Sequence, residues 1–408
     1  MRSSELAEAA PDLRTGRGRV AAIIVLGHAF KHIYTSGLQN ILLPEMKIGL
    51  SLSATQLGAL AFSRQATGWA STMTSGYLGD RFPHRASAML GVSLGLTGVS
   101  FFAAGFAPGY WTMLLAMLLI GIGPSMYHPP ALGALSRRFP DKRGLATSLH
   151  GTGGTLGEVL GPLTAAGLLA LLSWRGVLQS GLLPALLCAI LLWRSMSDVP
   201  GGSPGSQSAR AYLSSFARLF GNRSLSILVL ATVLRSAGQI GVVLFLPVYL
   251  REDLEFSPAK VAVYLSLAQV VGIGAQPAMG YLSDRFGRKA VLLPAMTALG
   301  LLFLALRFAD PGAQLLLTIL CLGGFLYSLH EISIAAAMDV SAEDVQATAA
   351  SLIYGASFIG AISPVIAGVI VDASGTTSDA FLYGGAMALL GATVLSSLKL
   401  TKPTAHTV

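Results

Sequence analysis

The chain has 408 residues, of which 53% are hydrophobic and only 11% are charged. Soluble domains carry about 25% charged residues, so the composition excludes a water-soluble globular protein and predicts an integral membrane protein. The formal net charge of +8 is explained by membrane topology and lipid contact, and it requires no nucleic-acid partner. Cys188 and Cys321 lie inside apolar segments without metal-ligand spacing, so neither a disulfide framework nor a metal site is predicted.

Twelve segments come close to or exceed the roughly 20 apolar residues that a helix needs to cross a bilayer. In chain order these segments are 20–43, 54–78, 86–106, 111–135, 144–172, 176–193, 225–248, 258–282, 290–308, 315–338, 347–371 and 380–398. The 47 glycines suit this all-α prediction, because small residues let membrane helices approach closely.

The second and eighth segments end in a repeated loop. The stretch GYLGDRFPHR at 76–85 returns as GYLSDRFGRK at 280–289, a shift of 204 residues or half the chain. The repeat predicts two pseudo-symmetric six-helix bundles. Membrane transporters commonly consist of two such repeats, with the substrate site between them near the bilayer midplane.

The predicted regions are a cytoplasmic tail at 1–19, a first bundle at 20–194, a linker at 195–222 and a second bundle with a short cytoplasmic tail at 223–408. The linker contains VPGGSPGSQS, whose Gly, Pro and Ser content predicts flexibility. Of the 27 Lys and Arg, 19 fall in the tails, between segments six and seven, and in the loops after segments two, four and eight. The positive-inside rule therefore places both termini in the cytoplasm.

The repeated loop carries an Asp followed by basic residues where each helix reaches the cytoplasm. Charge-assisted pairs between such residues and neighbouring helix ends would hold one state of a rocking transporter. The alternative is two ordinary positive-inside loops. The predicted gating residues are Gly76, Asp80, Arg81, Arg85, Gly280, Asp284, Arg285 and Arg288.

Twelve spans in two halves, with this loop in each half, resemble the major facilitator superfamily. The family pattern G-x-L-x-D-R-x-G-R-K is met almost fully by the second copy, whereas the first has Pro83 and His84 in place of Gly and Arg. The resemblance implies alternating access by rigid-body rocking of the two bundles, without enzyme activity or a cofactor. No Walker loop is present, so ATP is not expected to drive transport directly.

The fifth segment partly shows a family pattern associated with proton-exchanging exporters. Gly153, Gly157, Gly161 and Pro162 match it, while Ser148 stands where a further glycine would be expected. The pattern favours export. Ordinary helix packing through Gly157, Gly161 and Pro162 is the alternative.

A more specific resemblance lies in GIGPSMYHPPALGALSRRF at 121–139 and RGLATSLHGTGGTLGEVLGPL at 143–163. These stretches are similar to the fosmidomycin resistance subgroup, bacterial exporters of the major facilitator type. That subgroup has an acidic residue where this chain has Pro130. The resemblance implies a bacterial inner-membrane exporter but does not carry over a substrate.

Three basic residues lie inside predicted spans: Lys31, Arg64 and Arg235. Ionisable groups at membrane depth are costly and usually face a cavity or a partner. Lys31 and Arg235 are 204 residues apart, so the repeat predicts them on opposite walls of one cavity. Such cations suit an anionic substrate, and Arg suits a carboxylate or phosphonate through its bidentate fork. The alternative is a structural network in which Glu158 and Glu331 neutralise them.

The first span also carries a polar face, because its two histidines flank Lys31 at helical spacing. This face is expected to line the pathway. The predicted substrate-binding residues are Lys31, Arg64, Arg235, His28, His32, Gln239, Gln269 and Tyr127. The two glutamines have an alternative role as bridges between helices.

Two acids, Glu158 and Glu331, lie well inside spans and outside the repeated loop. A carboxyl between burial and a cation can change its protonation, and histidine titrates near neutral pH. The predicted proton-coupling residues are Glu158, Glu331, His330, His128 and His150. For His128 the alternative is a bond to a backbone carbonyl freed by the following prolines.

The sequence thus predicts a monomeric, proton-coupled exporter of a small organic anion or anionic drug-like compound. Its partners would be the substrate, protons and the lipid bilayer, with no metal and no nucleic acid. One alternative is an anion importer or exchanger of the same fold. Another is a non-transporting receptor or assembly subunit on a transporter scaffold, against which the ionisable residues inside the spans argue.

Overall fold

A computed structural model describes residues 16–139, 143–196, 222–341, 353 and 355–398, and all regular structure within these residues is helical. The elements in chain order are α1 (Arg17–Gly37), η1 (Leu38–Leu42), α2 (Leu43–Gly49), α3 (Ala54–Arg81), η2 (Pro83–Arg85), α4 (Ala86–Ala104), α5 (Tyr110–Ser125), α6 (His128–Arg138), α7 (Arg143–Leu169), α8 (Trp174–Ser180), α9 (Leu182–Met196), α11 (Arg223–Val248), η3 (Tyr249–Asp253), α12 (Pro258–Phe286), α13 (Arg288–Phe308), α14 (Ala313–Leu326), α15 (Ser328–Asp339), η5 (Gly360–Ile362), α17 (Ser363–Ser374) and α18 (Asp379–Ser396). The predicted all-α fold is confirmed.

Nine helical segments of the described chain are long and apolar enough to cross a membrane. The other predicted spans in this part fall on α1, α3 and α7, which carry Lys31, Arg64 and Glu158 respectively. Large apolar side chains such as Leu171, Trp111 and Phe308 are more than 70% exposed, as expected of a surface that faces lipid. The protein is therefore a multi-pass membrane protein.

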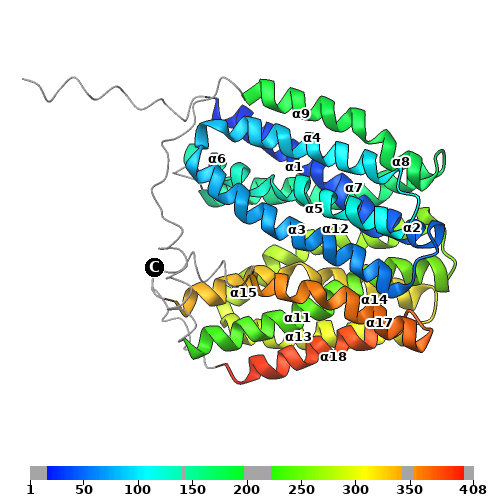
Figure 1. The fold of residues 1–408 in the computed structure, drawn as a ribbon. Helices are drawn as coiled ribbons and strands as arrows, with labels where there is room; N and C mark the ends of the chain where they lie inside the picture. The colour runs from blue at the N-terminus through cyan, green and yellow to red at the C-terminus, as the bar shows by residue number, and fades with distance from the viewer. Residues whose placement is uncertain (1–15, 140–142, 197–221, 342–352, 354, 399–408) are drawn as a thin grey trace, which may run out of the picture.

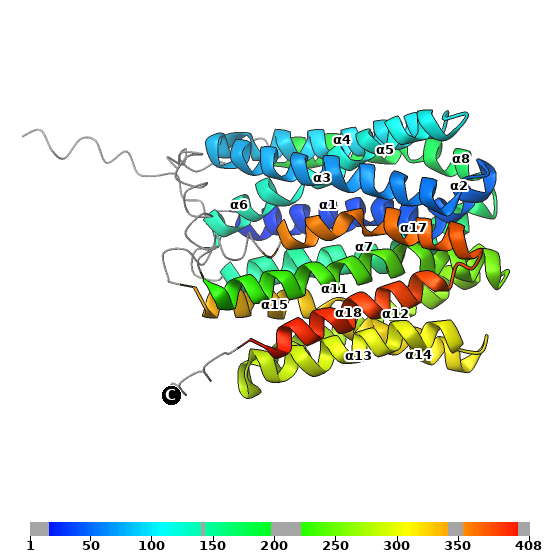
Figure 2. The ribbon, with the colours of Figure 1, turned by 60° about the horizontal axis from the view of Figure 1, so that its bottom comes forward.

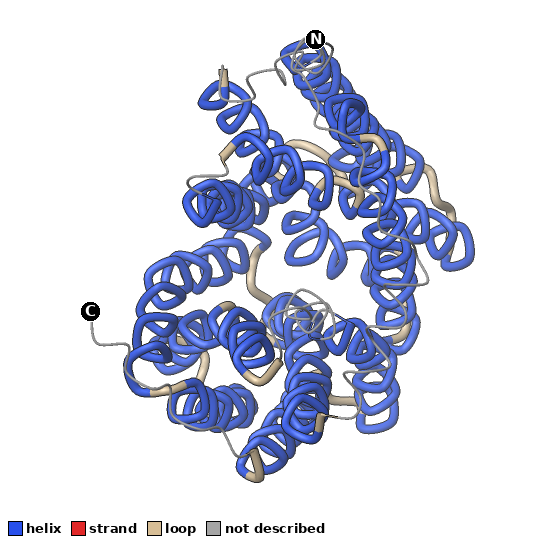
Figure 3. The backbone as a smooth tube through the Cα atoms, turned by 90° about the vertical axis from the view of Figure 1, so that its left-hand side faces the viewer, coloured by secondary structure: helices blue, strands red, loops and turns tan. Residues whose placement is uncertain are grey.

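The helices form two groups that lie one above the other in Figure 1, α1 to α9 in the upper group and α11 to α18 in the lower. Within the first group α1 packs on α7 and α3 on α5; within the second α11 and α13 pack on α18. Between the groups α3 packs on α17 and α7 on α12. The helices run roughly along one direction, as Figures 2 and 3 show from the side and end-on.

The fourth and tenth predicted spans are each divided into two helices at matching places. The first break falls between α5 and α6, beside Pro124 and the prolines that follow His128, and the second falls at Tyr327 between α14 and α15. Proline removes a backbone donor and frees carbonyls. Side chains donate to carbonyls at both breaks: Thr72 donates to that of Ser125, four residues before Pro129, and Gln276 donates to that of Tyr327 at the break without a proline.

Glycines allow α7 to lie directly against α1. A Cβ atom added at Gly157 would be 2.1 Å from the carbonyl oxygen of Ala29, and one at Gly153 would be 2.5 Å from that of Val25. No side chain other than hydrogen fits at these distances. Packing, the alternative stated for this glycine row, is thus sufficient to explain its spacing.

Two ion pairs join the groups at the end of the bundle that lies away from the start of α1 and the end of α18, here called the far side. Lys47 Nζ is 2.6 Å from Glu252 Oε2, and Arg251 Nε bonds to Glu45 Oε1. Lys47 and Glu45 belong to the first group, and Arg251 and Glu252 to the second. The opposite end, where α1 begins and α18 ends, is called the terminal side (Figure 1).

The helices α3 and α17 cross closely on the far side. Asp372 accepts a hydrogen bond of 2.8 Å from the backbone N–H of Ala54 and so caps α3 from the other group. A Cβ at Gly58 would lie 2.2 Å from the carbonyl oxygen of Pro364, and one at Gly368 would lie 2.5 Å from that of Ala54. The two backbones are in direct contact at this crossing.

The second copy of the repeated loop forms ion pairs inside its own group. Arg288 bonds to Asp284, and its Nε is 2.9 Å from a carboxylate oxygen of Asp339 at the end of α15. These are charge-assisted pairs with a neighbouring helix end, although none of them crosses to the first group. The side chain of Asp80 and nearly all of the predicted linker at 195–222 lie outside the described residues.

Candidate functional site

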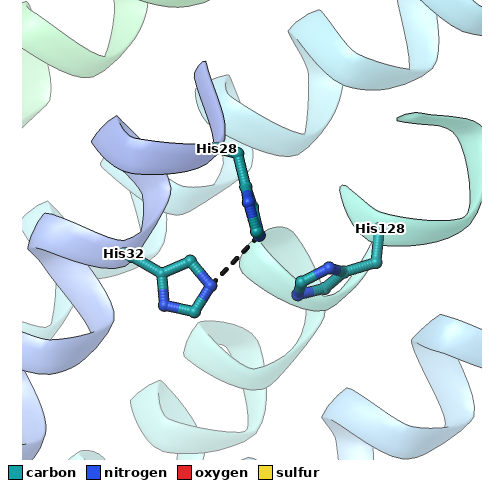
Figure 4. A group of neighbouring side chains, drawn as sticks. All are labelled: His28, His32 and His128. Carbon is teal, nitrogen blue, oxygen red and sulfur yellow. Dashed lines mark hydrogen bonds between the residues drawn. The ribbon is translucent and has the colours of Figure 1, made fainter. Parts of the chain in front are cut away.

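Four of the seven histidines gather between α1, α6 and α7. The rings of His28 and His150 stack with centroids 3.7 Å apart and an interplanar angle of 8°. His28 Nε2 is 3.1 Å from His32 Nε2, and the His28 and His128 rings meet edge to face at 4.7 Å (Figure 4). The sequence had divided these histidines between substrate and proton roles, whereas the structure places them in one cluster.

Hydrogen bonds fix the rings of this histidine cluster. His28 Nδ1 donates to the backbone carbonyl of His150 at 2.7 Å. Lys31 Nζ lies 2.8 Å from His128 Nε2, and His128 Nδ1 lies 3.5 Å from His150 Nε2. The carbonyl bond suggested as an alternative for His128 is therefore wrong. In the described structure it is His28 that makes a bond of this kind.

Glu158 on α7 joins the cluster through His32, whose Nδ1 is 3.3 Å from Glu158 Oε1. Lys31 is the cation that interacts most strongly with this carboxyl, and it also interacts with Arg64. Lys31 is only 4% exposed. A buried cation, a carboxyl and four imidazoles thus share one region of the first group.

The ligand nitrogens of His28, His32 and His128 lie within 4.8 Å of one another, which is a spacing that a transition metal could use. Two of these nitrogens are hydrogen-bonded to each other, and the third faces the Lys31 amine at 2.8 Å. A metal ion would have to displace a buried cation. The donor set is thus better matched to a hydrogen-bonded network than to a metal centre.

Arg64 on α3 lies at the edge of the same region. Its Nη2 donates to Gln39 Oε1 at 3.0 Å. Its Nε is buried and has no acceptor among the described residues. None of the described residues forms a salt bridge with Arg64. Its positive charge and its unused N–H donor therefore remain available to bind another group.

Arg235 on α11 occupies the second group, only 2% exposed. Its guanidinium bonds to Gln239 and, through Nη2, to Ser236 Oγ at 3.0 Å, while its buried Nε has no acceptor in the described part of the chain. Gln239 also donates to the carbonyl of Leu326 at 3.0 Å. Gln239 therefore bridges α11 and the break before α15, which was its alternative role.

Gln269, Tyr127 and Glu331, three other predicted residues, differ in their burial and in their partners. Gln269 on α12 is buried, and its Oε1 has no partner among the described residues. Tyr127 is fully buried and donates from its hydroxyl to the carbonyl of Ile24 at 2.8 Å, so in this structure its hydroxyl is used inside the protein. Glu331 is exposed in the first turn of α15, and none of the described ion pairs joins it to the buried cations.

His330 stands beside Arg235, with which it interacts electrostatically. The arrangement parallels Lys31 and His128 in the first group, where a buried cation on the first helix also meets a histidine at the start of the helix after the break. The repeat predicts the pairing of the two cations and places His128 near the counterpart of His330, and the structure adds the contact of each histidine with a cation.

Sequence reasoning missed one contact at the interface of the groups. Ser266 Oγ on α12 donates to the carbonyl of Val159 at 2.8 Å, directly after Glu158. Tyr327, one of several aromatics that the sequence offers as residues shaping the cavity, interacts with both Glu158 and Gln269. A serine in an apolar span is too common to signal such a contact. The matching helix breaks were the available signal for Tyr327.

A family model described as "Major Facilitator Superfamily" matches residues 28–362 and 228–408. The chain belongs to the major facilitator superfamily. Its relatives in this family are transporters and not enzymes, as the sequence predicts. The polar residues of α1, α3 and α7, together with Arg235 on α11, are therefore candidates for a transport site.

Among curated major facilitator relatives, the chain is 26% identical over 364 residues to "Uncharacterized MFS-type transporter YfnC" of Bacillus subtilis, covering 87% of each chain. It is 29% identical over 182 residues to the "Fosmidomycin resistance protein" of Escherichia coli, covering 44% of this chain and 43% of that one. It is 25% identical over 410 residues to the "Hexuronate transporter" of Bacillus subtilis, covering 94% of both.

A crystal structure of the nucleoside transporter NupG superposes with a TM-score of 0.75 at 16% identity. The match covers 94% of this chain and all of that one. At this identity the likeness establishes the major facilitator fold and leaves the substrate open.

Proposed function

We propose that the chain is a proton-coupled transporter of a small organic anion in a bacterial inner membrane, working by alternating access. The observation that carries the proposal is a pair of arginines with unused, buried N–H donors. Arg64 and Arg235, one in each group, each keep a buried guanidinium N–H without an acceptor among the described residues. A carboxylate or similar anion between them would accept these hydrogen bonds in a geometry suited to Arg.

The surroundings of Glu158 support coupling of the anion to a proton. Lys31 and Arg64 interact with each other and Lys31 with Glu158, so an anion bound beside these cations screens their positive charge. With that charge screened, the carboxyl holds a proton more readily. Anion and proton therefore favour each other's binding and would move together.

Export remains a second candidate because of one specific observation, the match of part of the chain to a fosmidomycin resistance protein. The glycine pattern on α7 supports export less than the sequence suggests, since packing against α1 accounts for it. Full-length similarity to a protein named as a hexuronate transporter supports an anion without favouring a direction.

Proteoliposomes test the proposal with matched compounds. Glucuronate and glucose differ chiefly by a carboxylate, so we expect uptake of glucuronate or fosmidomycin and not of glucose or choline. An inward proton gradient should accelerate entry of the anion if both move together, and should drive it out of preloaded vesicles if they exchange. Uptake of choline or glucose with no response to any anion would refute the proposal.

A further inference from the structure

The orientation of His28 determines where the hydrogens lie in the histidine cluster. Its Nδ1 faces a backbone carbonyl at 2.7 Å, and a carbonyl oxygen only accepts, so Nδ1 carries the hydrogen. Neutral His28 then presents a lone pair on Nε2. His32 Nε2, 3.1 Å away, must donate to it. His32 in its neutral form therefore has its only ring hydrogen on Nε2.

The other ring nitrogen of His32 faces a carboxyl, with Nδ1 3.3 Å from Glu158 Oε1. A bare Nδ1 opposite an ionised carboxylate would bring two lone pairs together. One additional proton, on Nδ1 or on the carboxyl, turns the contact into a charge-assisted pair or a hydrogen bond. The contact between His32 and Glu158 therefore requires one proton more than a neutral imidazole and a carboxylate contain.

Lys31, His128 and His150 form the other half of the cluster, and their contacts require no additional proton. The Lys31 ammonium only donates, so His128 Nε2 accepts from it at 2.8 Å and the ring hydrogen of His128 is on Nδ1. That nitrogen faces His150 Nε2 at 3.5 Å, which leaves the hydrogen of His150 on Nδ1. A further proton on His128 would bring a second positive charge against Lys31.

The charged and titratable groups near Glu158 lie on several elements. α1 contributes Lys31 and His32, and α6, which also packs on α7, contributes His128. Arg64 on α3 acts through Lys31. The break before α15 contributes Tyr327, whereas the described neighbours on α12 are the uncharged Ser266 and Gln269. No second carboxylate among these groups competes for the proton.

From this geometry we infer that the exchangeable proton resides between His32 and Glu158, and that His28, His128 and His150 stay neutral, each with its hydrogen on Nδ1. The inference rests on the proposed function, because it names the groups in that site that carry the coupled proton. It moves His32 from the predicted substrate contacts to the proton pair. It also removes His128 and His150 from the groups that titrate.

Nitrogen NMR of the full-length protein tests this without any substrate. Histidine labelled with 15N, in lipid nanodiscs, reports which ring nitrogens carry hydrogen, and single His→Gln variants assign the signals. At neutral pH we expect Nδ1–H tautomers for His28, His128 and His150. Glu158→Gln should convert His32 alone to the neutral Nε2–H form, because the new amide donates to Nδ1.

His84 provides the matched control, since it is exposed and lies far along the chain from the cluster. His84→Gln should leave the cluster signals unchanged. If Glu158→Gln does not fold, infrared spectra of His32→Gln decide instead, because the proton should then appear on Glu158 as a protonated carboxyl band. An unchanged His32 signal in Glu158→Gln, or a response of His128 or His150 to pH between 6 and 8, would overturn the inference. Failure of anion uptake with the expected spectra would overturn only the proposed function.

Discussion

Arg235 and Arg64 owe their candidate role to donors that the described protein leaves unused. Replacing either by Lys keeps the charge but removes the planar fork. Hydrogen bonds to charged groups contribute about 1.5–3 kcal/mol, so we expect KM for glucuronate to rise about 10- to 100-fold in each variant. Transport kinetics in proteoliposomes measure this directly.

Arg223 is a control on the same helix as Arg235, because it is exposed at the start of α11. Arg223→Lys should leave KM unchanged. If Arg235→Lys and Arg64→Lys behave like Arg223→Lys, Arg235 and Arg64 are structural and the anion proposal loses its main support.

Tyr127 provides the opposite test, since its hydroxyl is used inside the protein. Tyr127→Phe removes the bond to the carbonyl of Ile24 and should cost about 1 kcal/mol of stability, with a melting temperature lower by about 2 °C. KM for the transported anion should stay constant. A changed KM with unchanged melting would show that Tyr127 reaches the substrate after all.

For single residues, the sequence indicates the polar face of α1 and the three cations inside the spans. Spacing of three and four residues brings His28, Lys31 and His32 together on any helix. The position of His150 against His28 depends instead on how α7 packs on α1. Periodicity within one helix carries no information about that contact.

Alanine substitutions at Gly157 and Gly151, both on α7, distinguish the effect of contacts between helices from that of intrinsic helix propensity. A Cβ at Gly157 would overlap the backbone of Ala29, and no side-chain rotation relieves the overlap, so Gly157→Ala should destabilise the protein by about 1–3 kcal/mol. At Gly151 nothing lies within 4 Å of the added Cβ. Gly151→Ala should therefore be neutral or stabilising, because Ala favours a helix.

Thermal unfolding in one detergent measures both glycine variants. Equal melting temperatures for the two would contradict the close contact between α1 and α7. Loss of transport in Gly157→Ala with normal melting would instead revive a direct role of this glycine row in the transport cycle.

The helices themselves were predictable because spans of apolar residues have few alternatives in a bilayer. The break at Tyr127 was signalled by prolines, whereas the break at Tyr327 has no proline beside it. This second break places Glu331 in the first turn of a new helix, where it is exposed. The sequence predicts an unbroken tenth helix. It therefore gives no indication that the Glu331 carboxyl is exposed.

For the whole molecule, the far-side ion pairs should bias the balance between conformations. Two half-buried pairs contribute about 1 kcal/mol together, so Lys47→Met with Arg251→Met should shift the population about fivefold toward separation of the groups at that side. Spin labels at Leu171 and Asp310, exposed on the two groups, would report longer distances after Cys188 and Cys321 are replaced.

A charge swap is the control for this shift. Lys47→Glu combined with Glu252→Lys restores one pair with reversed signs, so the distance distribution should return toward that of the native protein. A distribution that does not respond to neutralising both pairs would show that packing of α3 on α17 alone determines the state.

We expect the contact of Gly58 with Pro364 to act as the pivot when the two groups of helices rotate against each other. Gly58 lies near the far-side start of α3, and the 23 residues from there to Arg81 form a stiff arm of about 35 Å. A rotation of about 10° around the crossing would move the terminal-side end of that arm by about 6 Å, while the crossing itself hardly shifts. A side chain added at Gly58 should therefore change the amplitude of this rotation more than the affinity for the transported substrate.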